Sequence, residues 1–293
     1  MLSNIRREIR ERLDRDKTAE KENNFVKNGM IPWSEGYVEY KLQYIKKSIN
    51  DKEIIKSFKE TNLDANYGYR LDERAIEYPW IISRIPKGNQ KLLDAGSTFN
   101  FDYILDHELI SGKELTIYTY SPESESFNHR KISYVYGDLR DLPFKDNLYD
   151  FIVSQSTIEH IDMDNSLYGY DLPRNDNLQE KSYEYLKAVN EMVRVLKFGG
   201  QLILTFPFGK FENHGFFQQF DKAMLDKIQS IFSENGSYET VFFKYEEKGW
   251  RNAKLNDVIE SESFNPHTGK GMKKDNAAHS RAVACLHFKK RVK

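Results

Sequence analysis

The stretch of the chain that decides its fold is residues 134–161, which read YVYGDLRDLPFKDNLYDFIVSQSTIEHI. It contains two short apolar runs, Tyr134–Tyr136 and Phe151–Ser154, and polar residues follow each run directly. Short runs rich in aromatic and β-branched residues are typical of buried strands. We therefore predict two strands here, with polar groups placed where each strand ends.

Similar apolar runs alternate with helical patterns along the rest of the chain. Alternation of this kind indicates a parallel sheet covered by helices on both faces. The expected strands are Lys91–Ala95, Leu115–Tyr120, Tyr134–Tyr136, Phe151–Ser154, Gln201–Phe206, Tyr238–Tyr245 and Ala282–Lys289, and the expected helices among them are Tyr103–Leu109, Glu180–Leu196 and Asp221–Phe232. The sequence predicts an α/β fold with a doubly wound, Rossmann-like, seven-stranded and mostly parallel sheet.

The first 85 residues have a different pattern. Apolar residues recur there at helical spacing in three places, namely Leu2–Leu13, Val38–Ile49 and Leu71–Ile85. We expect residues 1–85 to form a helical extension or cap and residues 86–293 to form the ligand-binding domain. Two polar segments of that domain, at about 162–179 and 249–280, are longer than ordinary connections, and we interpret them as lid insertions.

The composition argues against several kinds of partner. The 44 basic and 45 acidic residues nearly cancel, so no net field attracts nucleic acid or anionic lipid. The single cysteine, Cys285, excludes an internal disulfide and a cysteine-based zinc site. No stretch approaches the roughly 20 apolar residues of a membrane span. We expect a cytoplasmic protein that acts on a small molecule or glycan, and the N-terminal helices are a candidate homodimer interface.

Residues at the ends of the first four strands are candidates for ligand binding, because doubly wound sheets bind ligands at the carboxyl ends of their strands. The first strand contains Asp94, and Gly96 follows it, which lets the backbone approach a ligand closely. Asp138 follows the third strand, and Ser154 and Gln155 end the fourth. Alternatively, Asp138 is a turn-capping aspartate without a functional role.

The order and spacing of these strand-end motifs resemble those of the class I S-adenosylmethionine-dependent methyltransferases. The resemblance covers about Leu92–Pro207 and rests on LLDAGS at 92–97, GDLRDLPF at 137–144 and VLKFGG at 195–200. It implies that S-adenosyl-L-methionine is the cofactor and S-adenosyl-L-homocysteine the product. A nicotinamide dehydrogenase shares the layered architecture, but it needs a G-x-G-x-x-G run that this chain lacks after its first strand.

The resemblance also implies roles for individual residues. The cofactor's methionine end would lie at Asp94 and Gly96, its adenine at Asp138 and Leu139, and its sulfonium above Ser154 and Gln155. Two departures stand out. Thr98 and Asn100, close after Ser97, occupy places where the family has further glycines, and Thr119 stands where it has an acidic residue for the ribose. Ribose binding would then fall to Thr119, Tyr120 or Glu123.

Methyl transfer to a hydroxyl needs an in-line approach and a base that takes the proton. His160 follows the fourth strand and His214 the fifth, so both are candidate catalytic residues. The alternatives are a packing role for His160 and a solvated loop position for His214. The segment Phe206–Phe217 resembles methyltransferases of bacterial surface-polysaccharide clusters, which implies O-methylation of a sugar or a nucleotide-linked glycan precursor in polysaccharide biosynthesis.

Other interpretations stay open at the level of sequence. The departures at Thr98, Asn100 and Thr119 would also suit a non-catalytic scaffold protein with a methyltransferase fold, and the acceptor could be a natural product rather than a sugar. Glu159, Asp162 and Asp164 offer oxygen ligands for a metal, but acidic loop residues are usually solvated, so no metal is predicted. In the extension, Arg74, Glu77, Tyr78 and Trp80 are placed to close over the cofactor or, alternatively, to belong to the core.

Overall fold

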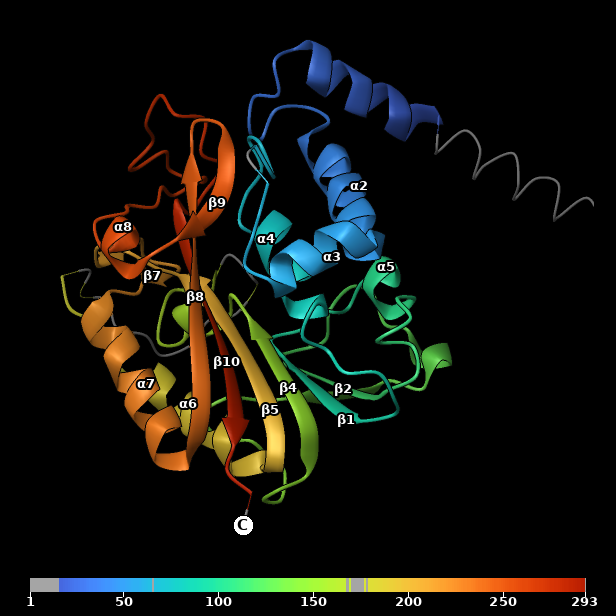
Figure 1. Cartoon of the computed structure of the whole chain (residues 1–293), viewed down its shortest axis with the longest axis vertical. Helices are drawn as coiled ribbons and strands as arrows, with labels where there is room; N and C mark the ends of the chain where they lie inside the picture. Colours follow the sequence, from blue (N-terminus) through green and yellow to red (C-terminus); the bar gives the residue numbers. More distant parts are fainter. Residues whose placement is uncertain (1–15, 65, 167–168, 170–176, 178, 293) are drawn as a thin grey trace, which may run out of the picture.

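A computed structural model describes residues 16–64, 66–166, 169, 177 and 179–292. The expected helix Leu2–Leu13 and much of the expected lid at 162–179 lie outside the described residues. One sheet forms the centre of the molecule (Figure 1). Its strands, in order across the sheet, are β3 (Ser133–Tyr136), β2 (Glu114–Thr119), β1 (Lys91–Ala95), β4 (Tyr149–Gln155), β5 (Leu196–Pro207), β10 (Ala282–Lys290), β8 (Gly236–Glu246) and β9 (Gly249–Ala253).

The pairing of the strands confirms the predicted fold class. From β3 through β5 all neighbours run parallel, whereas β10 runs antiparallel to both β5 and β8. All seven predicted strands are present. The eighth, β9, pairs antiparallel with β8 inside a segment that we expected to be irregular. It was missed because GWRNA has no apolar alternation, and it is held instead by the buried Trp250, whose Nε1 donates to the Leu71 oxygen at 2.9 Å.

Helices flank the sheet, and a small hairpin follows β5. They are α2 (Tyr37–Asn50), α3 (Lys52–Lys59), α4 (Arg74–Ile82), α5 (Asp102–Leu105), η1 (Asn128–Arg130), η2 (Ile158–His160), α6 (Tyr185–Val195), α7 (Lys222–Asn235) and α8 (Leu255–Val258), with the hairpin strands β6 (Glu212–Asn213) and β7 (Gln218–Gln219). Residues 16–27 are also helical. Helix α3 was not predicted, and it begins because Asp51 caps it by accepting from the backbone N–H groups of Glu53 and Ile54.

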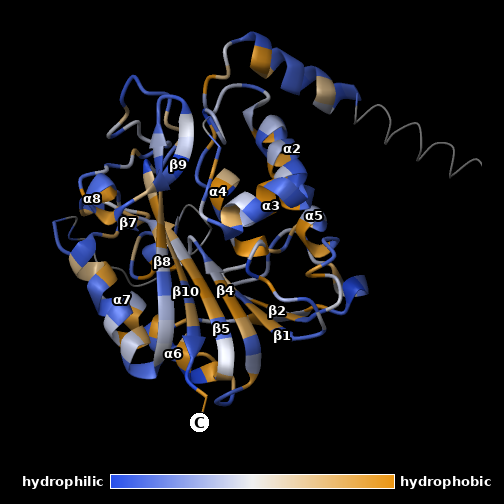
Figure 2. Ribbon diagram, in the orientation of Figure 1, coloured by the Kyte–Doolittle hydropathy of each residue, from blue (hydrophilic) through white to orange (hydrophobic). Residues whose placement is uncertain are grey.

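Two hydrophobic cores lie on opposite faces of the sheet. In β10, Ala284, Leu286 and Phe288 pack with the buried faces of α6 and α7, whereas the alternate residues Val283 and Cys285 pack with α4 and its neighbours. Side chains of a strand alternate between the two faces, so a strand that is apolar throughout must be covered on both. Figure 2 shows mainly apolar residues along the central parts of these strands, with polar residues on the outer faces of the helices.

Helix α4 is fastened to the sheet through one fully buried carboxylate, that of Glu77. Its Oε1 accepts from Ser156 Oγ at 2.5 Å and from Thr205 Oγ1 at 2.7 Å. Its Oε2 accepts from Arg74 Nη1 at 2.6 Å and from Gln155 Nε2 at 3.3 Å. Because Gln155 ends β4, Ser156 follows it and Thr205 lies in β5, this carboxylate fixes the helix against the edge where the strands end.

We predict that Glu77→Leu lowers the free energy of unfolding by about 3–5 kcal/mol, because it leaves the Arg74 guanidinium without its buried partner. The double variant Arg74→Met with Glu77→Leu should lose less than the sum of the two single variants. Urea denaturation monitored by circular dichroism measures both. Glu239→Leu removes a half-exposed carboxylate from Arg84 and is the control, with an expected loss of no more than about 1 kcal/mol. A similar loss for Glu77→Leu and Glu239→Leu would contradict this prediction.

Candidate functional site

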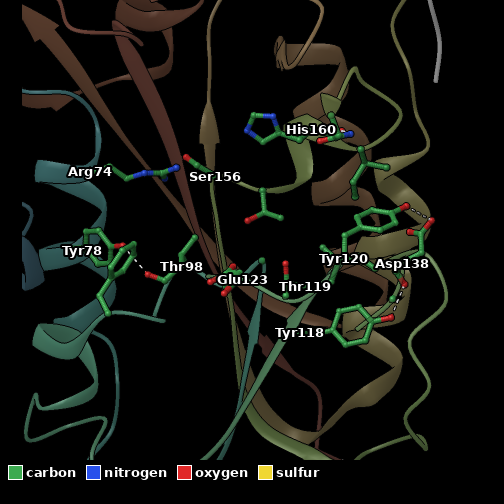
Figure 3. A pocket seen from close by; sticks show the side chains of 18 of the residues that line it. Arg74, Tyr78, Thr98, Tyr118, Thr119, Tyr120, Glu123, Asp138, Ser156 and His160 are labelled. Carbon is green, nitrogen blue, oxygen red and sulfur yellow. Dashed lines mark hydrogen bonds between the residues drawn. The ribbon is translucent and has the colours of Figure 1, made fainter. Parts of the chain in front are cut away.

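A cavity of about 570 Å³ lies at the edge of the sheet where β1 to β4 end. Its floor is made of residues that end or follow these strands, and α2 closes it from above through Val38, Lys41, Leu42 and Ile45. Figure 1 shows α2 over this end of the sheet, and Figure 3 shows the side chains that line the cavity. This volume lies within the usual range for a site that encloses a small molecule or cofactor.

The structure brings most of the sequence-predicted site residues to this cavity. Those that line it are Gly96, Ser97, Thr98, Thr119, Tyr120, Asp138, Leu139 and His160. Asp94, Ser154, Gln155 and His214 do not line it. Of the four extension residues, Arg74 and Tyr78 reach the cavity, whereas Glu77 and Trp80 are buried behind its wall.

Asp94 shapes the loop after β1 from below. Its side chain is fully buried and accepts hydrogen bonds from the backbone N–H groups of Thr98 and Phe99, at 3.2 and 2.7 Å, and from the Thr98 hydroxyl at 3.2 Å. Burial raises the pKa of this carboxyl group to about 7, although these hydrogen bonds act in the opposite direction. Asp94 therefore reaches the cavity only through the loop that it holds.

Ser154 and Gln155 also lie behind the wall of the cavity. The Ser154 hydroxyl donates to the Ala95 oxygen at 2.9 Å and so joins the ends of β4 and β1. Gln155 is fully buried and donates to Glu77. Both residues position the strand ends rather than line the space between them.

The loop after β1 requires its glycine. Gly96 has a φ of +132°, and a Cβ atom built on it would lie 2.1 Å from the Thr157 hydroxyl oxygen. Ser97 follows with a φ of 61°, a left-handed conformation that is rare outside glycine. On the far side of the loop, the Tyr78 hydroxyl of α4 donates to the Thr98 oxygen at 2.7 Å. The glycine thus lets the β1 and β4 loops approach each other beneath the cavity.

Asp138 presents a carboxylate at the cavity wall. Burial raises the pKa of Asp138. Hydrogen bonds from the side chain and backbone N–H of Arg140 and from the Tyr120 hydroxyl have the larger, opposite effect, so the net pKa lies below its usual value. The group is therefore ionised at neutral pH. Arg140, whose guanidinium pairs with Asp138 at 2.6 Å, also lines the cavity and was not singled out from the sequence. Its position two residues after Asp138 was the feature of the sequence from which its place in the cavity wall could have been predicted.

An acidic residue does lie beside the end of β2, although not at the expected position. Glu123 lines the cavity, and its Oε2 accepts from Asn100 Nδ2 at 2.7 Å. Asn100 in turn accepts from the Tyr134 hydroxyl at 2.9 Å. The departures at Asn100 and Thr119 are thus linked in space. Asn100, which stands in a glycine position of the family pattern, holds the Glu123 carboxylate that lies near Thr119.

A second, smaller cavity of about 170 Å³ adjoins the first. The two share Lys41, Arg74, Ser156 and His160 in their walls. The remaining walls of the smaller cavity are aromatic and polar, and consist of Trp33, Asp72, Glu73, Glu159, Phe216, Phe217, Pro266, His267 and His279. Burial raises the pKa of Glu159 well above its usual value, which favours the neutral form of this carboxyl group.

The two predicted histidines occupy different places. His160 borders both cavities, and its Nδ1 lies 2.6 Å from the Phe216 oxygen. Burial lowers its pKa to about 4, and the neighbouring Arg74 contributes to that shift. His214 lines neither cavity. Its ring stacks on Phe217 at 4.6 Å, and its Nε2 lies 3.6 Å from the Glu212 carboxylate.

The described residues contain no group of three or more histidine, cysteine or acidic side chains arranged to hold a metal ion. Among the same residues, no helix combines the length and the apolar character needed to cross a membrane.

Comparison with known proteins gives one domain match. Residues 110–204 match the family described as "Methyltransferase domain". No curated protein matches the chain. Among solved structures, the YcgJ protein of Bacillus subtilis is similar with 15% identity and a TM-score of 0.43, over 71% of this chain and 94% of that one. A possible histamine N-methyltransferase of Thermotoga maritima shows 14% identity and a TM-score of 0.42, over 85% and 99%.

Structural similarity with such low identities and TM-scores carries no argument about the function of this chain. The domain match and the fold are the relevant observations. The matched segment contains β2 to β4 and most of β5, and three of the four strand ends that form the cavity floor lie within it. The strand order places this cavity where doubly wound sheets bind their ligands. The domain match and the strand order support a class I S-adenosylmethionine-dependent methyltransferase.

Proposed function

We propose that the protein transfers the methyl group of S-adenosylmethionine to a hydroxyl of a polar small molecule, and that this acceptor is a sugar or a nucleotide-linked precursor of a surface glycan. The observation that supports the proposal is the second cavity, which adjoins the larger one and combines charged, imidazole and aromatic walls. Aromatic faces with a few directed polar groups suit a polar ligand such as a sugar. The cytoplasmic location and a dimer through the N-terminal helices stay predictions.

The chemistry of the lining residues favours one orientation of the cofactor in the larger cavity. Asp138 and Leu139 would meet the adenine, since an ionised carboxylate accepts from the amino group of the ring. The ribose would lie between Thr119, Tyr120 and the displaced Glu123. The methionine end would lie on Gly96, Ser97 and Thr98, which Asp94 holds in place. Ser154 and Gln155 would act by fixing the floor below the sulfonium.

This direction brings the reactive methyl toward the shared wall of the two cavities. His160 borders that wall, so we propose that it is the predicted histidine that contacts the acceptor. With a pKa of about 4 it is neutral near pH 7 and is a weak base, which suits hydrogen bonding to the acceptor better than proton removal. His214 packs behind Phe217, and its predicted catalytic role has no contact with either cavity to support it.

Gly96→Ala is expected to weaken S-adenosylhomocysteine binding at least tenfold, because the new methyl group would meet Thr157 and displace the loop. Isothermal titration calorimetry with the purified chain measures the affinity. Gly112→Ala is the matched control, since nothing lies within 4 Å of the added carbon. Equal affinities in the two variants would place the cofactor away from this loop.

Methyl transfer from radiolabelled S-adenosylmethionine to a panel of nucleotide sugars tests the acceptor class. The parent chain should label at least one of them on oxygen. His160→Ala should raise the KM for the acceptor and lower turnover at least tenfold, whereas His214→Ala should change turnover less than threefold once corrected for stability. Labelling of amines alone, in a parallel panel of amino sugars, would contradict O-methylation. The opposite ranking of the two histidine variants would restore His214 as the residue that contacts the acceptor.

A further inference from the structure

In the smaller cavity, His279 is paired with the carboxylate of Glu73, although the sequence did not single out this histidine. His279 Nδ1 lies 2.7 Å from Glu73 Oε1 and 3.1 Å from the Ser280 hydroxyl. The other carboxylate oxygen, Oε2, accepts from the Ser280 backbone N–H at 3.3 Å. An ionised carboxylate can only accept a hydrogen bond, so the short contact places a proton on Nδ1 of His279.

The charge state of Glu73 supports this proton position. Burial raises the pKa of Glu73, but the adjacent His279 and the Arg74 guanidinium outweigh burial and lower it below its usual value. Glu73 therefore stays ionised across the physiological range. A carboxylate that holds Nδ1–H leaves Nε2 as the basic atom of the ring and stabilises the imidazolium once Nε2 takes a proton.

The pair lies beside the place where the methyl group is expected. Both residues line the smaller cavity, and Arg74 and His160 line this cavity and the cofactor cavity alike. His279 also lies close enough to His160 to lower that residue's pKa. Figure 3 shows Arg74, Ser156 and His160 together along one side of the cofactor cavity, which marks the wall that the two cavities share.

We propose that the smaller cavity is the acceptor subsite and that Nε2 of His279, oriented by Glu73, takes the proton of the acceptor hydroxyl. The acceptor oxygen forms a bond to the methyl carbon, and the bond from that carbon to sulfur breaks with its electron pair left on sulfur. The hydroxyl proton passes to His279 and from there to solvent. This inference rests on the proposed O-methyl transfer and deepens it.

The size and charge of the subsite limit the acceptor further. A cavity of about 170 Å³ encloses one polar ring rather than a whole nucleotide sugar, so the rest of the acceptor would extend outside it. Its aromatic walls include Phe217, on which the His279 ring rests at 4.9 Å. The titratable and charged groups that face His279 there are Lys41, Asp72, Glu73, Arg74, Glu159, His160 and His267. Of these, Glu73 makes the direct contact.

The tautomer of His279 tests the inference without any acceptor. Nitrogen-15 NMR of the histidine rings in the full chain, saturated with S-adenosylhomocysteine, distinguishes the two neutral forms. His279, assigned with the His279→Gln variant, should carry its proton on Nδ1 at pH 8. In the Glu73→Gln variant the fraction of His279 rings with the proton on Nδ1 should fall, because the negative charge that holds this proton is lost. A proton on Nε2 in the parent chain at pH 8 would overturn the proposal.

Kinetics with the nucleotide sugar that the parent chain methylates separate catalysis from structure. His279→Gln should lower turnover by about 10²–10⁴-fold, leave S-adenosylhomocysteine affinity within threefold and remove the acidic limb of the pH profile. The control is His287→Gln, which alters a histidine of β10 paired with Glu239 outside both cavities, and it should leave turnover within threefold. Turnover within threefold in His279→Gln would overturn the proposed base. Failure of the parent chain to bind S-adenosylhomocysteine would instead contradict the proposed function, and the tautomer of His279 would then be measured in the chain without ligand.

Discussion

The buried carboxylate of Glu77 is the interaction on which the rest of the site depends. It accepts hydrogen bonds from residues at the ends of β4 and β5 and from Arg74 in its own helix. A buried carboxylate without partners is strongly unfavourable, so these donors and the position of α4 must form together. Helix α4 in turn carries Arg74 and Tyr78 to the larger cavity. Glu73, just before its first residue, reaches the smaller cavity.

The carboxylates of the site have two different roles in this arrangement. Asp94 and Glu77 are fully buried and act on the backbone and on neighbouring side chains, so they determine the shape of the cavities. Asp138 and Glu123 line the larger cavity, and Glu73 lines the smaller one. Side chains that face a cavity are available to a ligand, whereas the buried pair gives the walls their rigidity. The N-terminal extension is therefore part of the site rather than an appendage, because α2 and α4 both contribute to its walls.

The sequence alone was sufficient for seven of the eight strands of the central sheet, because the information there is local. Each strand is a short apolar run, and the strand ends carry Gly96 and Asp138 at places that topology brings together. Helix α3 and strand β9 were missed, since one depends on a single cap at Asp51 and the other on the burial of Trp250. The pair of Glu73 and His279 could not be predicted at all. Its members are 206 residues apart, and no pattern in a single sequence links them.

The crystal structure of the chain with S-adenosylhomocysteine tests the central claim most directly, namely that the edge of the sheet fastened by Glu77 holds the cofactor and turns its sulfur toward a separate acceptor cavity. The account predicts adenine beside Asp138 and Leu139, the homocysteine on the loop at Gly96, and the sulfur facing the wall shared by Ser156 and His160. A ligand bound in the opposite direction, with adenine at that shared wall, would contradict it.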